Sequence, residues 1–193
     1  MTPVATMDDV TARASVLSAA DQVFYERGVT GTGMAEIRDA SGVSLRRLYG
    51  LYPSKAELVA AWLTDRHRTW MAWFEAAVEE QSARGVEPLL AAFDAIAAWS
   101  RTPGYRGCGF LNTAAEIVEI DERHRAIIAS HKRDLIAYLA GLARDSEYRS
   151  PAELAEMLAV LIDGAIVQAA VLSSIEPVNA ARGAASQLLE AAR

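Results

Sequence analysis

The sequence predicts an all-α fold of about nine helices. Alanine dominates the apolar positions, and aromatic residues make up only 7% of the 193 residues. This composition favours closely packed helices over sheets, which depend on β-branched and aromatic side chains. Turn-forming residues divide the chain into segments, and the apolar residues within each segment repeat with helical spacing.

The helices are expected in the following order. The first carries an apolar stripe that includes Val16 and Ala20, and it ends at Arg27-Gly28, where glycine supplies a left-handed stop. Two short helices follow, over about 34–40 and 45–50. A long one begins near Ser54, which forms a capping box with Glu57, and reaches about residue 82. The remaining helices are predicted over 86–101, 108–118, 121–145, 151–174 and 177–192.

The net charge of −6 is unevenly distributed. Residues 1–55 contain six basic and six acidic groups, whereas the rest of the chain contains 13 basic and 19 acidic groups. Between residues 44 and 55 there are three cations (Arg46, Arg47 and Lys55) and no acid. The local charge of this short segment therefore suits a polyanion such as DNA, even though the whole chain is acidic.

The composition also predicts a cytoplasmic protein. A single cysteine, Cys108, excludes an internal disulfide and fits a reducing compartment. Charged residues interrupt the apolar stretches, so no membrane span is expected. The first dozen residues carry Asp8 and Asp9 and no basic group, which is unlike a secretory signal.

Residues 32–44 have the spacing of a helix-turn-helix. Gly42 permits a tight turn between two short helices, and Ser44 is placed to cap the second of them. The second helix of such a motif enters the major groove of DNA. The residues expected to face the core are Ile37, Ala40, Val43 and Leu48.

A larger set of residues, spread over roughly 13–60, surrounds this motif. Its members are Val16, Leu17, Ser18, Ala19, Ala20, Val23, Phe24, Glu26, Arg27, Gly28, Thr32, Ile37, Gly42, Val43, Ser44, Leu48, Tyr49, Tyr52, Ser54, Lys55 and Leu58. Together they resemble the N-terminal signature of the TetR family of repressors. The sequence departs from the family pattern at Arg38, usually a small residue, at the pair Arg46-Arg47, and at Leu51 and Tyr52.

The resemblance implies a helix-turn-helix DNA-binding domain over 1–55 and a helical domain for ligand sensing and dimerisation over 56–193. It places Leu45, Arg46 and Arg47 where the family reads bases, and arginine can bond O6 and N7 of guanine together. Tyr49 and Lys55 fall where family members contact phosphates. The full set of residues expected at DNA is Thr32 and Gly33, whose backbone amides begin a helix, with Ser44, Leu45, Arg46, Arg47, Tyr49 and Lys55.

Beyond residue 60, residues 106–116, 130–133 and 163–165 resemble one branch of TetR-type C-terminal domains. Aromatic residues, and polar residues within apolar helical runs, are the candidates for an effector pocket, because a buried polar group needs a partner. These candidates are Trp70, Phe74, Trp99, Cys108, Asn112, Glu116, His131 and Asp163. The alternative for each aromatic residue is an ordinary core position, and for the polar groups a network within the protein. The spacing of the acidic and histidine residues predicts no metal site.

The last two helices are expected to form a homodimer interface. Small residues along them allow close approach of two copies in a four-helix bundle. The stripes expected to face the partner are Leu154, Leu158, Leu161, Ala165 and Leu172, and Val178, Ala181, Ala185, Leu188 and Ala192. The alternative is a core within one chain.

These features predict a repressor that binds a palindromic operator in double-stranded DNA as a homodimer and is released by a small-molecule effector. One alternative is a regulator that binds DNA constitutively. Another is a redox sensor, because Cys108 lies near a helix start and near basic residues. An enzyme is not expected, because the sequence has no nucleophile elbow and no phosphate-binding glycine loop, and no cofactor is implied.

Overall fold

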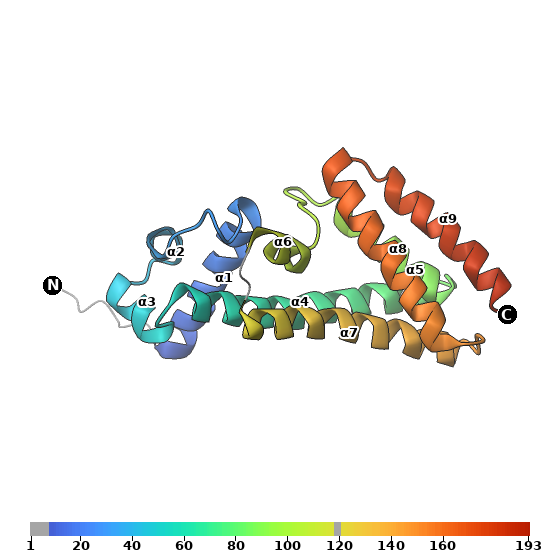
Figure 1. Ribbon diagram of the computed structural model, residues 1–193, viewed down its shortest axis with the longest axis horizontal. Coiled ribbons are helices and arrows are strands. Elements are labelled where there is room, and N and C mark those ends of the chain that lie inside the picture. The colour runs from blue at the N-terminus through green and yellow to red at the C-terminus, as the bar shows by residue number, and fades with distance from the viewer. Residues whose placement is uncertain (1–7, 118–120) are drawn as a thin grey trace. The chain divides into compact units, whose positions relative to one another are not determined.

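The computed structural model describes residues 8–117 and 121–193, and this part of the chain holds nine α-helices and no strand (Figure 1). The predicted all-α fold is confirmed. The helices are α1 (Asp9–Arg27), α2 (Met34–Ser41), α3 (Leu45–Leu51), α4 (Lys55–Ala83), α5 (Pro88–Ser100), α6 (Gly109–Glu116), α7 (Glu122–Asp145), α8 (Pro151–Leu172) and α9 (Glu176–Ala191). The helix expected over 108–118 ends at Glu116, and residue 118 lies outside the described residues.

The chain divides into two compact units. The first comprises the described residues up to 66 together with 110–117 and 121–127, and the second comprises 67–109 and 128–193. Helices α4 and α7 each supply residues to both units. The division therefore does not follow chain order, because α6 belongs to the first unit although it comes after α5 in the sequence. The predicted boundary between residues 55 and 56 stays a prediction.

The first unit contains α1, α2 and α3, which contact one another in a compact group (Figure 1). Ile37, Val43 and Leu48 are buried between these helices, as expected from the sequence. Burial of each such side chain stabilises the fold by about 1.5–3 kcal/mol. Ala40 is exposed, contrary to expectation, because the eight-residue α2 buries only Ile37.

Local hydrogen bonds fix where α1 begins and ends. Asp8 caps α1, since its Oδ1 accepts a hydrogen bond from the Thr11 backbone N–H at 2.9 Å. This bond lowers the pKa of the Asp8 carboxyl below its usual value. At the other end, Gly28 stops the helix with a φ of +84°, a conformation that costs glycine least.

Helix α4 is fastened to α1 by a polar cluster. Asp21 on α1 accepts a hydrogen bond of 2.8 Å from the Trp62 indole N–H, and it also pairs with the guanidinium of Arg66. The Trp62 ring packs edge-on against Phe24, with 5.2 Å between ring centroids. The same guanidinium lies 4.2 Å from the centre of the Tyr25 ring. One carboxylate therefore joins two successive turns of α4 to α1.

In the second unit, α5, α8 and α9 pack against one another, and α8 and α9 lie side by side (Figure 1). Arg182 on α9 holds Asp94 on α5 through two bonds of 2.7 and 3.1 Å. The Asp94 carboxylate raises the pKa of Arg182, which keeps the pair charged. The α9 helix is thus anchored to its own chain.

Helix α8 contradicts the expectation that charged residues interrupt every long apolar stretch. With 22 residues and few charges, it is long and apolar enough to cross a bilayer by length and composition. About 44% of its most apolar window is buried within the protein, and a helix packed in a protein core passes the same test. This finding is therefore weak support for a membrane span, and burial accounts for much of the apolar character of α8.

Candidate nucleic-acid interface and effector site

The second helix of the helix-turn-helix, α3, is held rigidly and presents an exposed face. Ser44 caps it, because its hydroxyl accepts a hydrogen bond from the Arg47 backbone N–H at 3.3 Å. Leu48, fully buried, anchors the helix to the core. The opposite face carries Leu45 and Tyr49, which are 38% and 46% exposed, together with the exposed Arg46. The structure therefore leaves two of the three predicted base-contacting residues, Leu45 and Arg46, accessible together with the predicted phosphate contact Tyr49.

Arg47 differs from Arg46 in its surroundings. Its side chain is only 26% exposed, and its Nη2 lies 3.0 Å from Oδ1 of Asp9 on α1. Sequence reasoning missed Asp9 as a member of this surface, because 38 residues separate it from Arg47. Only the packing of α1 beside α3 brings them together.

Thr32 and Gly33, predicted at DNA through their amides, already have partners within the protein. Thr32 is 2% exposed, and its hydroxyl donates to the Gly28 carbonyl at 2.7 Å. The Gly33 N–H donates to Oε2 of Glu36 at 2.8 Å, which lowers the pKa of the Glu36 carboxyl. Arg27 also bonds Glu36. Both residues shape the start of α2, and their contact with DNA stays a prediction.

Lys55, the first residue of α4, is half-buried at the edge of a pocket of about 320 Å³ in the first unit. His124 on α7 lies in the same pocket, where its Nε2 is 2.9 Å from the Ala56 carbonyl oxygen. Next to it, Arg123 pairs with Glu57 at 2.6 Å. The first turn of α7 thus holds the first turn of α4, which carries the predicted phosphate contact.

Glu116 and Asn112, predicted in the effector pocket, lie on α6 in the first unit. Glu116 accepts a hydrogen bond from the Thr30 backbone N–H at 3.2 Å through Oε2. A Cβ placed on Gly28 would come within 2.6 Å of the same carboxylate. The end of α6 therefore packs on the loop between α1 and α2, and the Glu116 carboxylate has its partners within the protein.

Four of the other predicted effector residues form one cluster in the second unit. Trp70 stacks on Phe74 with 4.9 Å between ring centroids. The rings of Trp99 and His131 pack edge-on against Trp70, with ring centroids 5.7 Å and 5.2 Å from that of Trp70. The Trp70 indole N–H is buried and, among the described residues, has no hydrogen-bond acceptor. An unsatisfied buried donor costs about 1–3 kcal/mol.

The remaining two candidates meet through a lysine that sequence reasoning had not assigned. Lys132 on α7 pairs with Asp163 on α8 at 2.5 Å, and its Nζ lies 3.9 Å from the Cys108 sulfur. The Cys108 side chain is buried. Lys132 follows His131 directly, and His131 faces His67 with 3.2 Å between their Nδ1 atoms. Among the described residues, no three His, Cys, Asp or Glu side chains are grouped to hold a metal ion.

Most members of the stripes predicted for the dimer interface do not face outward. Most of their members are buried within one chain, because α9 packs on α5 as well as α8. The buried members are Leu154, Leu158, Ala165, Val178, Ala181 and Ala185. Of the two stripes, Leu172 is 62% exposed, and Leu161, Leu188 and Ala192 are half-buried. The alternative of an intrachain core therefore holds for most of both stripes.

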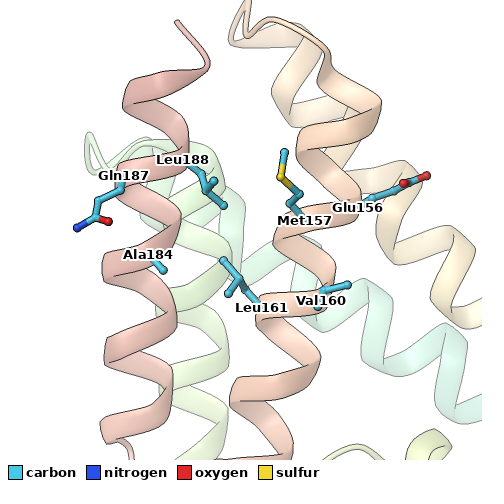
Figure 2. A pocket seen from close by; sticks show the side chains of 7 residues that line it. All are labelled: Glu156, Met157, Val160, Leu161, Ala184, Gln187 and Leu188. Carbon is cyan, nitrogen blue, oxygen red and sulfur yellow. The ribbon is translucent and has the colours of Figure 1, made fainter.

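A different face of α8 is apolar and exposed. Val160 and Val171 are 72% and 76% exposed, and Met157 and Val167 are 40% and 47% exposed. A groove of about 640 Å³ runs between α8 and α9 beside these residues. Figure 2 shows Met157, Leu161 and Leu188 pointing into the gap between the two helices. We refer to Met157, Val160, Val167, Val171 and the groove as the α8–α9 face.

Comparison with known proteins places these features in a family. Residues 16–62 match the family described as bacterial regulatory proteins, tetR family. The chain is 32% identical over 171 residues to the HTH-type transcriptional regulator TtgR of Pseudomonas putida, a match that covers 80% of this chain and 78% of that protein.

Solved structures share the whole fold. A putative TetR transcriptional regulator from Streptomyces avermitilis, SAV143, is 27% identical with a TM-score of 0.78, covering 94% of this chain and 97% of the other. SCO4454, a TetR-family regulator from Streptomyces coelicolor, has a TM-score of 0.79 at 24% identity, covering 95% of this chain and 96% of the other. At that identity the second likeness concerns the fold alone.

Proposed function

Because the chain belongs to the TetR family of bacterial transcriptional regulators, we propose that it is a cytoplasmic, ligand-responsive repressor. It binds a palindromic operator as a homodimer, and a small-molecule effector releases it. The observation that carries the proposal is the capped, core-anchored α3 with Leu45, Arg46 and Tyr49 on its exposed face. That face presents to the major groove the side-chain types that bind base edges and phosphates.

The α8–α9 face supports the homodimer. Exposed apolar side chains in a row on one helix are stabilised when a second copy covers them. A C2 dimer brings the same face from both chains together and sets two α3 helices at a fixed separation, which requires an operator with two related half-sites. We assign this contact to the exposed side chains of Met157, Val160, Val167 and Val171 and to the groove that Met157 and Val160 border.

The Trp70 cluster supports the effector site. A ligand with an oxygen acceptor would satisfy the buried Trp70 N–H, and the half-buried ring of Trp99 would pack against an aromatic or planar ligand. We include His131 in this wall and place Cys108 and Asp163 beside Lys132 on α7. We assign Glu116 and Asn112 to α6, through which the first unit responds to the effector.

The test of DNA recognition is selection of genomic fragments on the purified protein. The wild type is expected to enrich a palindromic sequence, and the double variant R46A/R47A is expected to lose it, because each good base contact contributes about 1–3 kcal/mol. R84A is the control, since Arg84 pairs with Glu80 at the end of α4 and carries the same charge. If the wild type enriches no sequence at moderate salt, the proposed function fails.

The effector is tested next with compounds handled by the products of genes beside the selected sites. W70F is expected to weaken release from the operator, because phenylalanine retains an aromatic ring in the cluster and removes the N–H. W73F is the control, since Trp73 is 38% exposed in the same cluster. If no compound alters operator binding by the wild type, the constitutive alternative is favoured.

One observation favours a redox response as the second candidate. The ammonium of Lys132 lies beside the buried Cys108 sulfur, and reactive cysteines share such basic surroundings. Under this alternative, oxidants release the wild type from the operator and do not release C108A. Equal release of both proteins would exclude it.

A further inference from the structure

The two neighbouring arginines of α3 are not equivalent. Arg46 is exposed and, in the part of the chain that the structure describes, forms no ion pair. Arg47 is three-quarters buried and bonded through Nη2 to Asp9, the first residue of α1. Asp9 itself is 80% exposed, so an accessible carboxylate lies next to α3. An acid on a surface that is to meet DNA needs an explanation, because phosphates repel it.

We propose that Asp9 is a specificity-determining positioning residue, which holds Arg47 for base reading and opposes its use on phosphates. The inference rests on the proposed function, since it presumes that α3 reads an operator. A guanidinium is a planar fork with five donors. With Nη2 held by Asp9, its remaining donors have a fixed plane, which suits in-plane contact with the edge of a base.

The carboxylate affects operator and random DNA unequally. On random DNA nearly all contacts go to phosphates, and an Arg47 side chain held at Asp9 brings that carboxylate close to the backbone, where it repels the phosphates. On the operator Arg47 keeps its partner while its free donors meet a base. Asp9 therefore weakens non-specific binding more than operator binding, and this difference is what sets specificity.

Asp8 provides a matched control one residue away. It is exposed like Asp9 and carries the same charge, but its carboxylate bonds Thr11 and has no contact with Arg47. Asparagine caps helices about as well as aspartate, so D8N removes the charge and keeps the cap. Any effect of charge alone on DNA affinity appears in D8N and D9N equally.

The experiment measures the affinities of the full chain for the selected operator and for a scrambled duplex of equal length, at several salt concentrations. D9N is expected to bind the scrambled duplex about three- to fivefold more tightly than D8N does, the range that exposed ion pairs support. The ratio of operator to scrambled affinity falls by that factor in D9N and stays at the wild-type value in D8N. Thermal melts check that both variants fold as the wild type does.

A second pair of variants isolates Arg47. In an R47A background, D9N and D8N are expected to bind the scrambled duplex equally at low salt, because the side chain that Asp9 holds is gone. The proposal is overturned if D9N and D8N give the same affinity ratio, or if their difference persists without Arg47. A wild type that selects no operator would instead contradict the proposed function, so the two failures are distinguishable.

Discussion

The two units of this chain keep their functional residues in opposite surroundings. In the first unit, Arg46 and Tyr49 are exposed on the short helix α3, and the Ser44 cap fixes where this helix begins. In the second, Trp70 and its neighbours form a packed cluster of rings from α4, α5 and α7. The predicted DNA-binding surface thus depends mainly on sequence-local bonds, with the Asp9–Arg47 pair as a long-range exception, whereas the predicted effector site depends throughout on residues far apart in the chain.

Substitutions in these two regions are therefore expected to have different consequences. A change on the exposed face of α3 alters binding with little effect on folding, since surface substitutions away from caps and core usually change stability by about 0.5 kcal/mol or less. A change in the ring cluster alters packing as well as any ligand contact.

The largest change, in the strength of dimerisation, is expected for a substitution in the α8–α9 face. Replacing Val160 with glutamate, V160E, places two carboxylates in the proposed dimer contact, where they are desolvated and unpaired, so dimerisation should weaken about 100-fold or more. Sedimentation velocity measures the change, and operator affinity should fall with it.

The control for this substitution is V10E. Val10 on α1 is 79% exposed and Val160 is 72% exposed, so neither substitution disturbs the core of a single chain. V10E should sediment as the wild type. If both variants sediment as dimers, the dimer contact lies elsewhere on the molecule.

An intermediate effect is expected at Gly28. Alanine there must adopt a φ of +84°, and its Cβ would come within 2.6 Å of the Glu116 carboxylate. G28A should lower the free energy of unfolding by about 1–3 kcal/mol. Urea unfolding measures the loss.

The strain has two causes, and a second variant separates them. In G28A/E116A the steric conflict is removed while the backbone strain stays. The double variant should therefore lose less stability than the sum of the two single variants. A strictly additive result would show that α6 does not press on this loop.

The smallest change, in the stability of the fold, is expected at alkaline pH from Tyr138 in the second unit. Burial, with added repulsion from Glu75 and Glu79, raises the pKa of Tyr138 from 10 to about 12. A raised pKa in the folded state means that stability is full below pH 10 and declines as the pH rises through 12. Thermal melts between these values should show a decline for the wild type that Y138F, which cannot ionise, lacks. If the wild type and Y138F lose stability equally, ionisation of a buried Tyr138 does not cause the decline.

The sequence predicted the helices and the DNA-binding motif well, because both depend on local signals. Gly28 and Gly42 end helices, Ser44 begins one, and apolar spacing marks the buried side of short amphipathic helices. The residues expected on the exposed face of α3 came instead from the resemblance to the TetR family. The positions of Ile37, Val43 and Leu48 in the core followed from the local pattern.

The rest depended on tertiary packing. Helix α8 is apolar on nearly every side, with Leu158 buried and Val160 exposed two residues later, so periodicity cannot tell the face covered by its own chain from the face left open. The Lys132–Asp163 pair and the Asp9–Arg47 pair join residues 31 and 38 positions apart. No spacing rule brings such groups together before the helices have packed.

The carboxylate of Asp21 has a consequence for operator design. Because it joins two turns of α4 to α1, and α1 packs on α3, we expect a shift of the first part of α4 to carry α1 and α3 along with it. Under the proposed function, an effector would then change the separation of the two α3 helices in a dimer without changing either helix-turn-helix. Operators lengthened or shortened by a single central base pair should accordingly change how much effector is needed for release, while the bases that each half-site prefers stay the same.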